Sequence, residues 1–188
     1  MVQDPTCVRP RPDGARHART ASRARGTYNR RVNERWKLPP PEITALLDAP
    51  PTPWVLLSPD TRWLLFVEHV ALPDLADIAR TKLKLAGLRI DPATNARHQT
   101  AFGSGLALRE RDASVVRRIA LPDGHRVSGL RWSPDSRRVA LTLVTERATE
   151  LWILDAERAE LTRLATRVNA VFGEGFEWLG DGEALLAT

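Results

Sequence analysis

The sequence predicts a mainly β protein: a partial β-propeller of about two to three blades, with a short N-terminal helix and a helical insertion. Three observations support this fold class. A Ser-Pro-Asp turn occurs at residues 58–60 and again at residues 133–135, and each copy lies between apolar runs. A weaker third copy is Leu179-Gly180-Asp181-Gly182. Trp132 and Trp178, which precede the second and third copies, are 46 residues apart, and a four-stranded blade takes about 40–50 residues.

The residue types of the turn explain why each copy predicts a hairpin. Proline presets the φ angle of a type I turn, and the serine or aspartate oxygen can accept hydrogen bonds from the amides of the turn. The apolar, partly β-branched runs on both sides are typical of paired strands. Each copy therefore predicts two antiparallel strands joined at a Ser-Pro-Asp corner.

The other elements follow in chain order. Proline at its start favours a short helix over residues 42–48, which the proline-rich segment 49–53 ends. The interval from Leu57 to Trp132 is 75 residues, longer than one blade, so we predict an insertion at about residues 71–99 with a short helix over residues 72–80 and an extended segment with a turn over residues 85–92. The remaining predicted elements are strands over residues 100–108, 113–121, 150–155 and 161–164, and turns at residues 122–124 and 156–159.

The basic charge of the chain belongs to its first 37 residues. The formal net charge is +5, and residues 1–37 carry ten Lys/Arg against three Asp/Glu. Low apolar content predicts a disordered tail over residues 1–37. Targeting to an organelle, and contact of its arginines with nucleic acid or a membrane surface, stay open as alternatives. Only Tyr28 precedes Trp36 as an aromatic residue, so nucleic acid is the least favoured partner.

Composition excludes several classes of protein and site. No apolar run approaches the roughly 18 residues that a membrane span needs. Cys7 is the only cysteine, so an intrachain disulfide and a cysteine-based metal site are excluded. No secretory signal is present, and the compartment stays unknown: the chain as given reads as cytoplasmic, with organellar targeting as the alternative. We predict no cofactor and no metal.

Several ordered segments resemble one branch of a known family. The Ser-Pro-Asp hairpins resemble the TolB/WD40-like blades of prolyl-oligopeptidase-family serine peptidases, and the match is closest with the glutamyl endopeptidases. The segments that carry the closer resemblance are Pro40-Pro41-Glu42-Ile43, Leu47-Asp48-Ala49-Pro50, residues 71–76, residues 84–92 and Thr94-Asn95. The resemblance covers roughly residues 38–188.

The resemblance implies a β-propeller followed by an α/β-hydrolase domain that carries the catalytic Ser, Asp and His. It also implies that the propeller filters substrates by size and that the full enzyme cleaves after glutamate. The hydrolase requires a Gly-x-Ser-x-Gly elbow, whereas the nearest strings here have Phe102 or Arg126 at the first glycine position. We therefore expect the hydrolase domain to be absent from this chain, and we carry over no catalytic, cofactor-binding or metal-binding residue.

Single residues that invite a functional interpretation have a structural alternative, which we favour. We predict that the scattered histidines lie at ordinary surface or loop positions, and that Glu68 and His69 form a solvated pair. Turn capping is expected for Asp60, Asp135 and Asp181, and packing against the sheet for Trp63, Trp132, Trp152 and Trp178. Two glycine-rich strings invite interpretation as phosphate-binding loops, but no Lys-Ser/Thr follows either of them. We therefore predict ordinary loops at Gly103-Ser104-Gly105 and Gly173-Glu174-Gly175. The histidines are His17, His69, His98 and His125.

Together these observations predict the N-terminal propeller part of a glutamyl-endopeptidase-like serine peptidase, inactive alone, whose peptide substrates are cleaved by the missing hydrolase domain. A non-catalytic module that binds peptides or proteins is the alternative, and nucleic-acid binding through the basic tail is a third. Because an open propeller fragment leaves strand edges unpaired, we also expect self-association of the isolated chain.

Overall fold

The computed structural model describes residues 39–188 except residue 181. The tail predicted over residues 1–37, with His17 and Cys7, lies outside these residues, as does Asp181. The chain divides into two units, residues 1–44 and 45–188. Helix α1 (Pro41–Leu47) begins at a proline as predicted, and none of its residues is buried.

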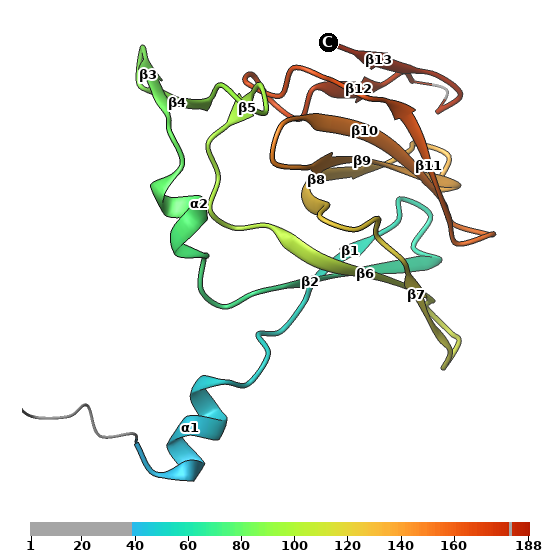
Figure 1. Ribbon diagram of the computed structural model, residues 1–188. Helices are drawn as coiled ribbons and strands as arrows, with labels where there is room; N and C mark the ends of the chain where they lie inside the picture. Colours follow the sequence, from blue (N-terminus) through green and yellow to red (C-terminus); the bar gives the residue numbers. More distant parts are fainter. Residues whose placement is uncertain (1–38, 181) are drawn as a thin grey trace, which may run out of the picture. The chain divides into compact units, whose positions relative to one another are not determined.

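Antiparallel strands build the larger unit as three layers, of which the first two are joined by one strand pair into a single eight-stranded sheet (Figure 1). The first layer is a four-stranded meander of β1 (Trp54–Leu57), β2 (Trp63–His69), β6 (Gly103–Glu110) and β7 (Val116–Ile119). The second layer repeats this order with β8 (Arg126–Trp132), β9 (Arg138–Val144), β10 (Thr149–Asp155) and β11 (Glu160–Ala165). The third layer is the pair β12 (Phe176–Trp178) and β13 (Leu185–Ala187).

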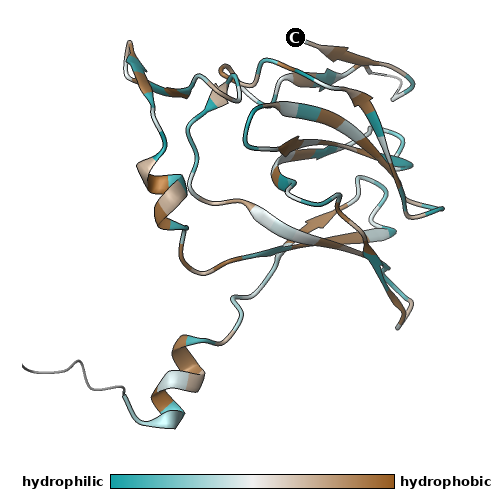
Figure 2. Ribbon diagram, viewed as in Figure 1, coloured by the Kyte–Doolittle hydropathy of each residue, from teal (hydrophilic) through white to brown (hydrophobic). Residues whose placement is uncertain are grey.

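The core lies between successive layers. Side chains from β2, β6 and β7 meet those from β8, β9 and β10 in one cluster, and a second cluster joins β9 and β10 to β12. The middle strand β9 is therefore buried on both faces: every residue from Val139 to Val144 is buried. This explains why β9 is an almost continuous apolar run, which is the pattern of a strand covered on both sides. Figure 2 shows the hydrophobic residues along these strands.

The three predicted turns share one backbone geometry. In each turn the N–H of the fourth residue donates to the C=O of the first, from Thr61 at 2.8 Å, from Ser136 at 2.9 Å and from Gly182 at 2.9 Å. The φ angles of these three residues are 61°, 63° and 73°. Only glycine adopts this left-handed region without a steric cost, so Gly182 has the residue type that the position favours.

Aspartate caps the first two turns, as predicted. The hydroxyl of Ser58 donates to Asp60 Oδ1 at 2.5 Å, and that of Ser133 donates to Asp135 Oδ1 at 2.6 Å. The carboxylate of Asp60 also accepts from the backbone N–H of Arg62 at 3.0 Å. The hydrogen bond from Ser58 holds the pKa of Asp60 below its ordinary value, because it stabilises the ionised carboxylate.

The second and third turns each contact the turn of the preceding layer. The backbone N–H of Asp60 donates to the hydroxyl of Ser136 at 3.0 Å. Gly182 occupies the same place against the second turn: a Cβ added to it would lie 3.2 Å from Cγ of Asp135 and 3.3 Å from its backbone nitrogen. The fourth residue of one turn therefore packs on the aspartate of the turn before it.

The segment between β2 and β6, called the insertion below, carries elements of its own. It holds helix α2 (Leu75–Ala79) and a small sheet of β3 (Leu83–Leu85), β4 (Leu88–Asp91) and β5 (Ala96–Arg97). The sheet is joined to the second layer's loops by a parallel bridge between Ala96 and Ala170. These elements agree with the predicted helix and the predicted extended segment with a turn.

The predicted mainly β fold class is confirmed, and the arrangement of the layers as propeller blades stays a prediction. The described residues form no closed ring, so the number of blades stays a prediction. The loop predicted at Gly103-Ser104-Gly105 is wrong, because β6 begins at Gly103 and pairs with Val127 of β8. Among residues 39–180 and 182–188, no helix has the length and apolar character needed to cross a membrane.

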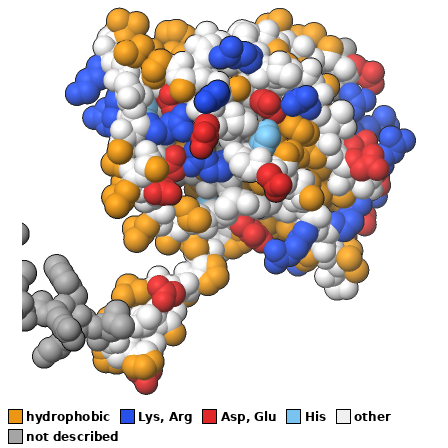
Figure 3. Space-filling view, in the orientation of Figure 1, with side chains coloured by type: hydrophobic (Ala, Val, Ile, Leu, Met, Phe, Trp, Pro, Cys, Tyr) orange, Lys and Arg blue, Asp and Glu red, His pale blue; other side chains and the backbone are white. Residues whose placement is uncertain are grey.

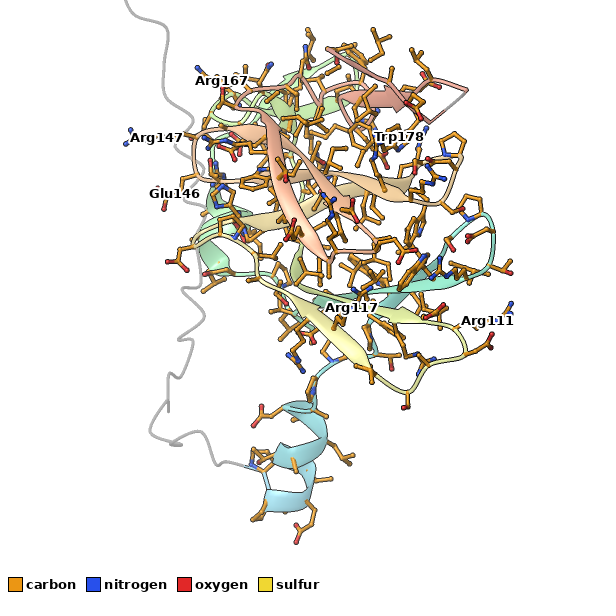
Figure 4. The ribbon with its side chains drawn as sticks, turned by 90° about the vertical axis from the view of Figure 1, so that its right-hand side faces the viewer. Arg111, Arg117, Glu146, Arg147, Arg167 and Trp178 are labelled. Atoms are coloured by element: carbon orange, nitrogen blue, oxygen red, sulfur yellow. The ribbon has the colours of Figure 1, made fainter. Side chains whose placement is uncertain are left out.

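Arg117 of β7 connects the first two layers, and its removal is expected to weaken them (Figure 4). Its guanidinium donates to the carbonyl oxygens of Ala156 and Glu157, both at 2.7 Å, and lies 5.1 Å from the ring centroid of Trp63. Arg117→Ala leaves both acceptors unpaired, so we expect urea unfolding to show a free energy of unfolding about 1–2 kcal/mol lower. Arg118→Ala is the matched control, since Arg118 is 81% exposed. Equal losses in both variants would contradict this role.

Candidate functional site

An open cleft of about 940 Å³ lies between the insertion and the loops of the second layer. Its walls come from α2 and β4 on one side and from the β7–β8 and β9–β10 connections on the other. Glu146 and Arg147 lie at the β9–β10 turn and project outward from it (Figure 4). The other charged side chains of the cleft are Asp74, Asp77, Arg80, Asp91, Asp123 and Arg126, and His125 also lines it.

Charged contacts hold the insertion against the second layer. Arg126 at the start of β8 donates to Asp77, the only buried residue of α2. Arg80 donates to Asp91 at 2.7 Å and to the carbonyl oxygen of Glu146 at 2.9 Å. Ion pairs of this kind are partly shielded from water, so breaking one leaves a costly unpaired charge. Asp77 and Arg80 of the insertion thus face the second layer.

Exposed apolar side chains lie on the outward surface of the insertion, and the exposed charged residues Lys84 and Arg89 lie among them. Figure 3 shows hydrophobic side chains over α2 and the β3–β4 hairpin. The exposed members of this surface are Leu72, Leu75, Ile78, Leu83 and Leu85, with exposures between 45% and 81%. A concentration of exposed apolar side chains marks a surface that a partner can cover.

Three donors converge on the buried carboxylate of Glu150 beside the cleft. His125 Nε2 lies 3.1 Å and Trp152 Nε1 2.9 Å from its Oε2, and Arg163 Nη1 lies 3.5 Å from its Oε1. The other ring nitrogen of His125 lies 3.0 Å from the carbonyl oxygen of Asp123. Both ring nitrogens of His125 lie within hydrogen-bonding distance of these oxygens, and neither contact is to a hydroxyl group. We interpret the cluster as a structural network that joins the β7–β8 connection to β10 and β11.

Sequence reasoning missed this network. His125 was predicted as an ordinary surface or loop histidine, and it does lie in a loop, but its side chain is only 15% exposed. Glu150, Trp152 and Arg163 come from strands β10 and β11, and their meeting with His125 depends on strand register and layer packing. Spacing along the chain carries no signal for such a contact.

A second, smaller pocket adjoins the cleft and shares Arg80, Asp91 and Arg126 with it. Glu174, from the loop before β12, contributes to its wall. Glu174 packs against β8, since a Cβ added to Gly129 would lie 3.1 Å from its Cγ. Burial raises the pKa of Glu174, and the nearby Arg131, 3.5 Å from Oε2, offsets only part of that effect.

Replacing Glu174 by glutamine is expected to raise the melting temperature at neutral pH. A carboxyl group with a raised pKa in the folded state lowers the stability of the protein as pH rises through that pKa. Glutamine has no charge to bury, so we expect a gain of about 1–3 °C at neutral pH that disappears in acid. Differential scanning calorimetry across pH measures it, with Glu177→Gln on exposed Glu177 of β12 as control. A lower melting temperature for Glu174→Gln at neutral pH would refute the interpretation.

The remaining residues singled out in the sequence fall into structural roles. Trp63 and Trp132 are buried between the first two layers, as predicted, and Trp152 and Trp178 are partly buried against the two clusters. His69 stacks on Trp54 with ring centroids 4.4 Å apart. These contacts explain the side chains without a ligand.

His98 lies beside Lys82 at 3.3 Å, and burial, reinforced by the charge of Lys82, lowers the pKa of its ring. In the part of the chain that the structure describes, no group of three or more His, Cys, Asp or Glu is placed to hold a metal ion.

Comparison with known proteins gives two relatives and no matching family model. The chain is 35% identical over 167 residues to a "Probable glutamyl endopeptidase, chloroplastic" of Arabidopsis thaliana, covering 81% of this chain and 17% of that protein. It is 32% identical over 168 residues to the protein of the same name in Oryza sativa subsp. japonica, covering 81% of this chain and 18% of that protein. The chain thus spans less than a fifth of the length of these relatives.

Solved structures give weaker matches. They include a "putative 6-phosphogluconolactonase" from Bacteroides uniformis, with 15% identity and a TM-score of 0.35 over 74% of this chain and 47% of that chain. A protein so described from Bacteroides fragilis also has 15% identity and a TM-score of 0.35, over 73% of this chain and 47% of that chain. No argument rests on likenesses at this level. Over four fifths of its length, the chain is a homologue of one part of proteins named as glutamyl endopeptidases.

Proposed function

We propose that this chain is the N-terminal part of the propeller domain of a glutamyl-endopeptidase-like serine peptidase. In the full-length enzyme this part governs the access of peptides to the active site and supplies no catalytic residue. The observation that carries the proposal is the identity of 32–35% to two proteins of that name over 81% of the chain. With it we propose a domain division: a basic tail over residues 1–37 and propeller structure over residues 38–188, with the insertion at about residues 71–99.

The repeated architecture supports the propeller part of the proposal. Two layers have the same order of four antiparallel strands, and each begins with a hairpin around a Ser-Pro-Asp turn. A third layer begins with a hairpin around the weaker copy at residues 179–182. Propeller blades are four-stranded antiparallel sheets that stack on one another. The layers β1-β2-β6-β7 and β8-β9-β10-β11 are then two blades, and β12-β13 begins a third.

The local structure supports the non-catalytic part. Ser104 belongs to the string nearest to a nucleophile elbow, and it lies inside strand β6 where the elbow requires a turn between strand and helix. Ser128 has its hydroxyl 2.8 Å from that of Thr142, and the ring of His125 faces Asp123 and Glu150. Neither serine is paired with a histidine base in these contacts.

Reading the gene beyond the codon for Thr188 tests the proposal first. We expect further Ser-Pro-Asp hairpins and then a Gly-x-Ser-x-Gly elbow. The encoded full-length product should react with a fluorophosphonate probe and cleave peptides after glutamate, whereas the 188-residue chain should do neither. Cleavage by the 188-residue chain, or a continuation without repeats and without the elbow, would overturn the proposal.

The apolar surface of the insertion favours one other function, an interaction module without catalysis. Leu72 and Leu75 are 81% and 79% exposed, so burying them against a partner is favourable. Light scattering after size exclusion separates the two functions. A mixture of associated species fits an open propeller fragment, while a defined oligomer that binds peptides would place the interaction module first.

A further inference from the structure

Every layer has a front face and a back face, which the second layer defines. Val139, the third residue after Ser136 of the turn, packs toward the first layer, and Ala140, the fourth, packs toward the third layer. Both side chains are completely buried. We call the side on which Val139 lies the front face of a layer and the side on which Ala140 lies its back face. At both junctions of the stack, a front face therefore meets the back face of the layer before it.

The front face of the first layer is left exposed. Leu64 of β2 is the third residue after Thr61 of the turn, so it takes the place of buried Val139. Phe66 takes the place of buried Leu141 in the same way, yet Leu64 and Phe66 are both partly exposed. Among the described residues no layer precedes the first one, which lies at one end of the stack (Figure 1). Strand register adds three apolar side chains to this face, each 49–51% exposed: Val55, Leu57 and Val116.

The back face of the third layer is exposed at the other end of the stack. Leu186 is the fourth residue after Gly182 of the turn, which gives it the place of Ala140 in the second layer. Ala140 is completely buried, whereas Leu186 is 60% exposed. Glu177 lies opposite Leu186 in the pairing of β12 with β13, so the two share this face. The back face therefore presents an apolar and an acidic side chain.

The charges on these two faces are opposite in sign. The front face of the first layer carries Arg109, Arg118 and Glu68, and Arg118 Nη1 lies 3.5 Å from Glu68. The guanidinium carbon of Arg109 lies 5.6 Å from the ring centroid of Phe66. Its Nε is buried and has no hydrogen-bond partner among the described residues. Because a buried donor without an acceptor is unfavourable, an acid such as Glu177 brought to this face would be stabilising.

We propose that the front face of the first layer docks on the back face of the third layer of a second copy of this chain. Two junctions inside the molecule already join faces of these kinds, so the second copy continues an interface that the fold uses twice. Leu186 of one copy then packs on Leu57 and Phe66 of the other, and Glu177 approaches Arg109. The inference goes beyond the proposed function and does not rest on it, because it uses only the surfaces of the described layers.

Sedimentation velocity on the 188-residue chain tests for the association. The third layer has two described strands and the first has four, so the contact covers only part of the front face. Interfaces of less than about 1,200 Å² are typical of weak complexes. Over about 1–500 µM we expect the weight-average sedimentation coefficient to rise, with a dissociation constant of about 10–100 µM. A coefficient that stays constant over this range would overturn the proposal.

Leu57→Asp and Leu186→Asp each place a carboxylate on one of the two docking faces. Each variant should weaken the association at least about tenfold, because docking would bury an unpaired charge. Leu72→Asp is the matched control, since it makes the same change at a leucine of the insertion that is 81% exposed. If Leu72→Asp loses the association and the other two variants keep it, the copies meet through the insertion and the proposal is wrong.

Mixing the two blocked variants tests the front-to-back arrangement itself. The Leu57→Asp chain keeps its back face, and the Leu186→Asp chain keeps its front face. An equimolar mixture should therefore form dimers with about the affinity of the unchanged chain, and no larger species. Dimers in the mixture also show that both variants are folded. A mixture that stays monomeric would contradict the proposal, while the gene-level test of the proposed function would be unaffected.

Glu177→Arg is a second variant with little risk to folding, because Glu177 is exposed. Reversing its charge should weaken the association at least about threefold, and adding salt should reduce this difference. Glu160→Arg, at an exposed position of β11, is the matched control. Equal affinity in the two variants would refute the role of the back face even if the aspartate variants failed to fold.

Discussion

Leu141→Ala is expected to lower the free energy of unfolding by about 2–5 kcal/mol, the largest loss we expect of a single truncation in this protein. Leu141 is fully buried in β9, where it packs between the first and second layers. Removing the side chain loses the free energy gained by transferring it out of water. It also leaves a cavity, because the elements packed on both faces of β9 cannot collapse into the space. Urea unfolding followed by tryptophan fluorescence measures the change.

Leu186→Ala provides the matched control for this truncation. Leu186 lies on β13 and is 60% exposed, so its removal should change the free energy of unfolding by no more than about 0.5 kcal/mol. Comparable losses for Leu141→Ala and Leu186→Ala would mean that the interface between the layers is not the core of the protein.

Gly103→Ala is expected to cost about 1–3 kcal/mol, although it adds only one methyl group. Gly103 lies where β6 meets β8, and an added Cβ would lie 2.6 Å from Cγ1 of Val67 and 2.9 Å from Cβ of Val127. Both valines are buried, with exposures of 1% and 4%. They cannot move aside without disturbing the packing between the layers, so the strands themselves must shift.

Gly105→Ala separates this steric effect from the general effect of glycine in a strand. A Cβ at Gly105, two residues along β6, would meet only the side chain of Glu68, with its carboxylate oxygen at 2.8 Å. Glu68 is 46% exposed and flexible, so it can move at little cost and the strand gains from losing a glycine. Thermal unfolding should show a loss for Gly103→Ala and none for Gly105→Ala. A loss of equal size in both would point to β6 as a whole.

The sequence predicts those parts of the fold that depend on neighbours along the chain. The Ser-Pro-Asp turns are local, because proline, the serine hydroxyl and the aspartate carboxylate act within a few residues of one another. The same holds for the hairpin strands and for the short helices. Gly103 shows where local reasoning is ambiguous: the glycines at 103 and 105 suggest a loop, while the run over residues 100–108 predicts a strand. Pairing of Gly103 with Val127 of β8 decides for the strand.

The candidate site depends on contacts between distant segments, and for that reason it could not be predicted. Arg80 and Arg126 are 46 residues apart in the chain, and each is held by an acid from a separate element. The meeting of His125 with Glu150 depends on the register of strands in the second layer. Pattern and propensity describe each strand by itself, whereas the offset between layers is fixed by packing.

The contacts between successive turns give the stack of layers a direction. Ser136 of the second turn accepts from Asp60 of the first, and Gly182 of the third lies in the same place against Asp135 of the second. Two different surfaces meet at each junction, so the junctions are heterologous and not isologous. Repetition of a heterologous junction has two outcomes: the rotation closes and a ring forms, or it does not and the array grows without end. The geometry of these turns therefore bears on whether such layers close into a finite propeller or extend as a filament.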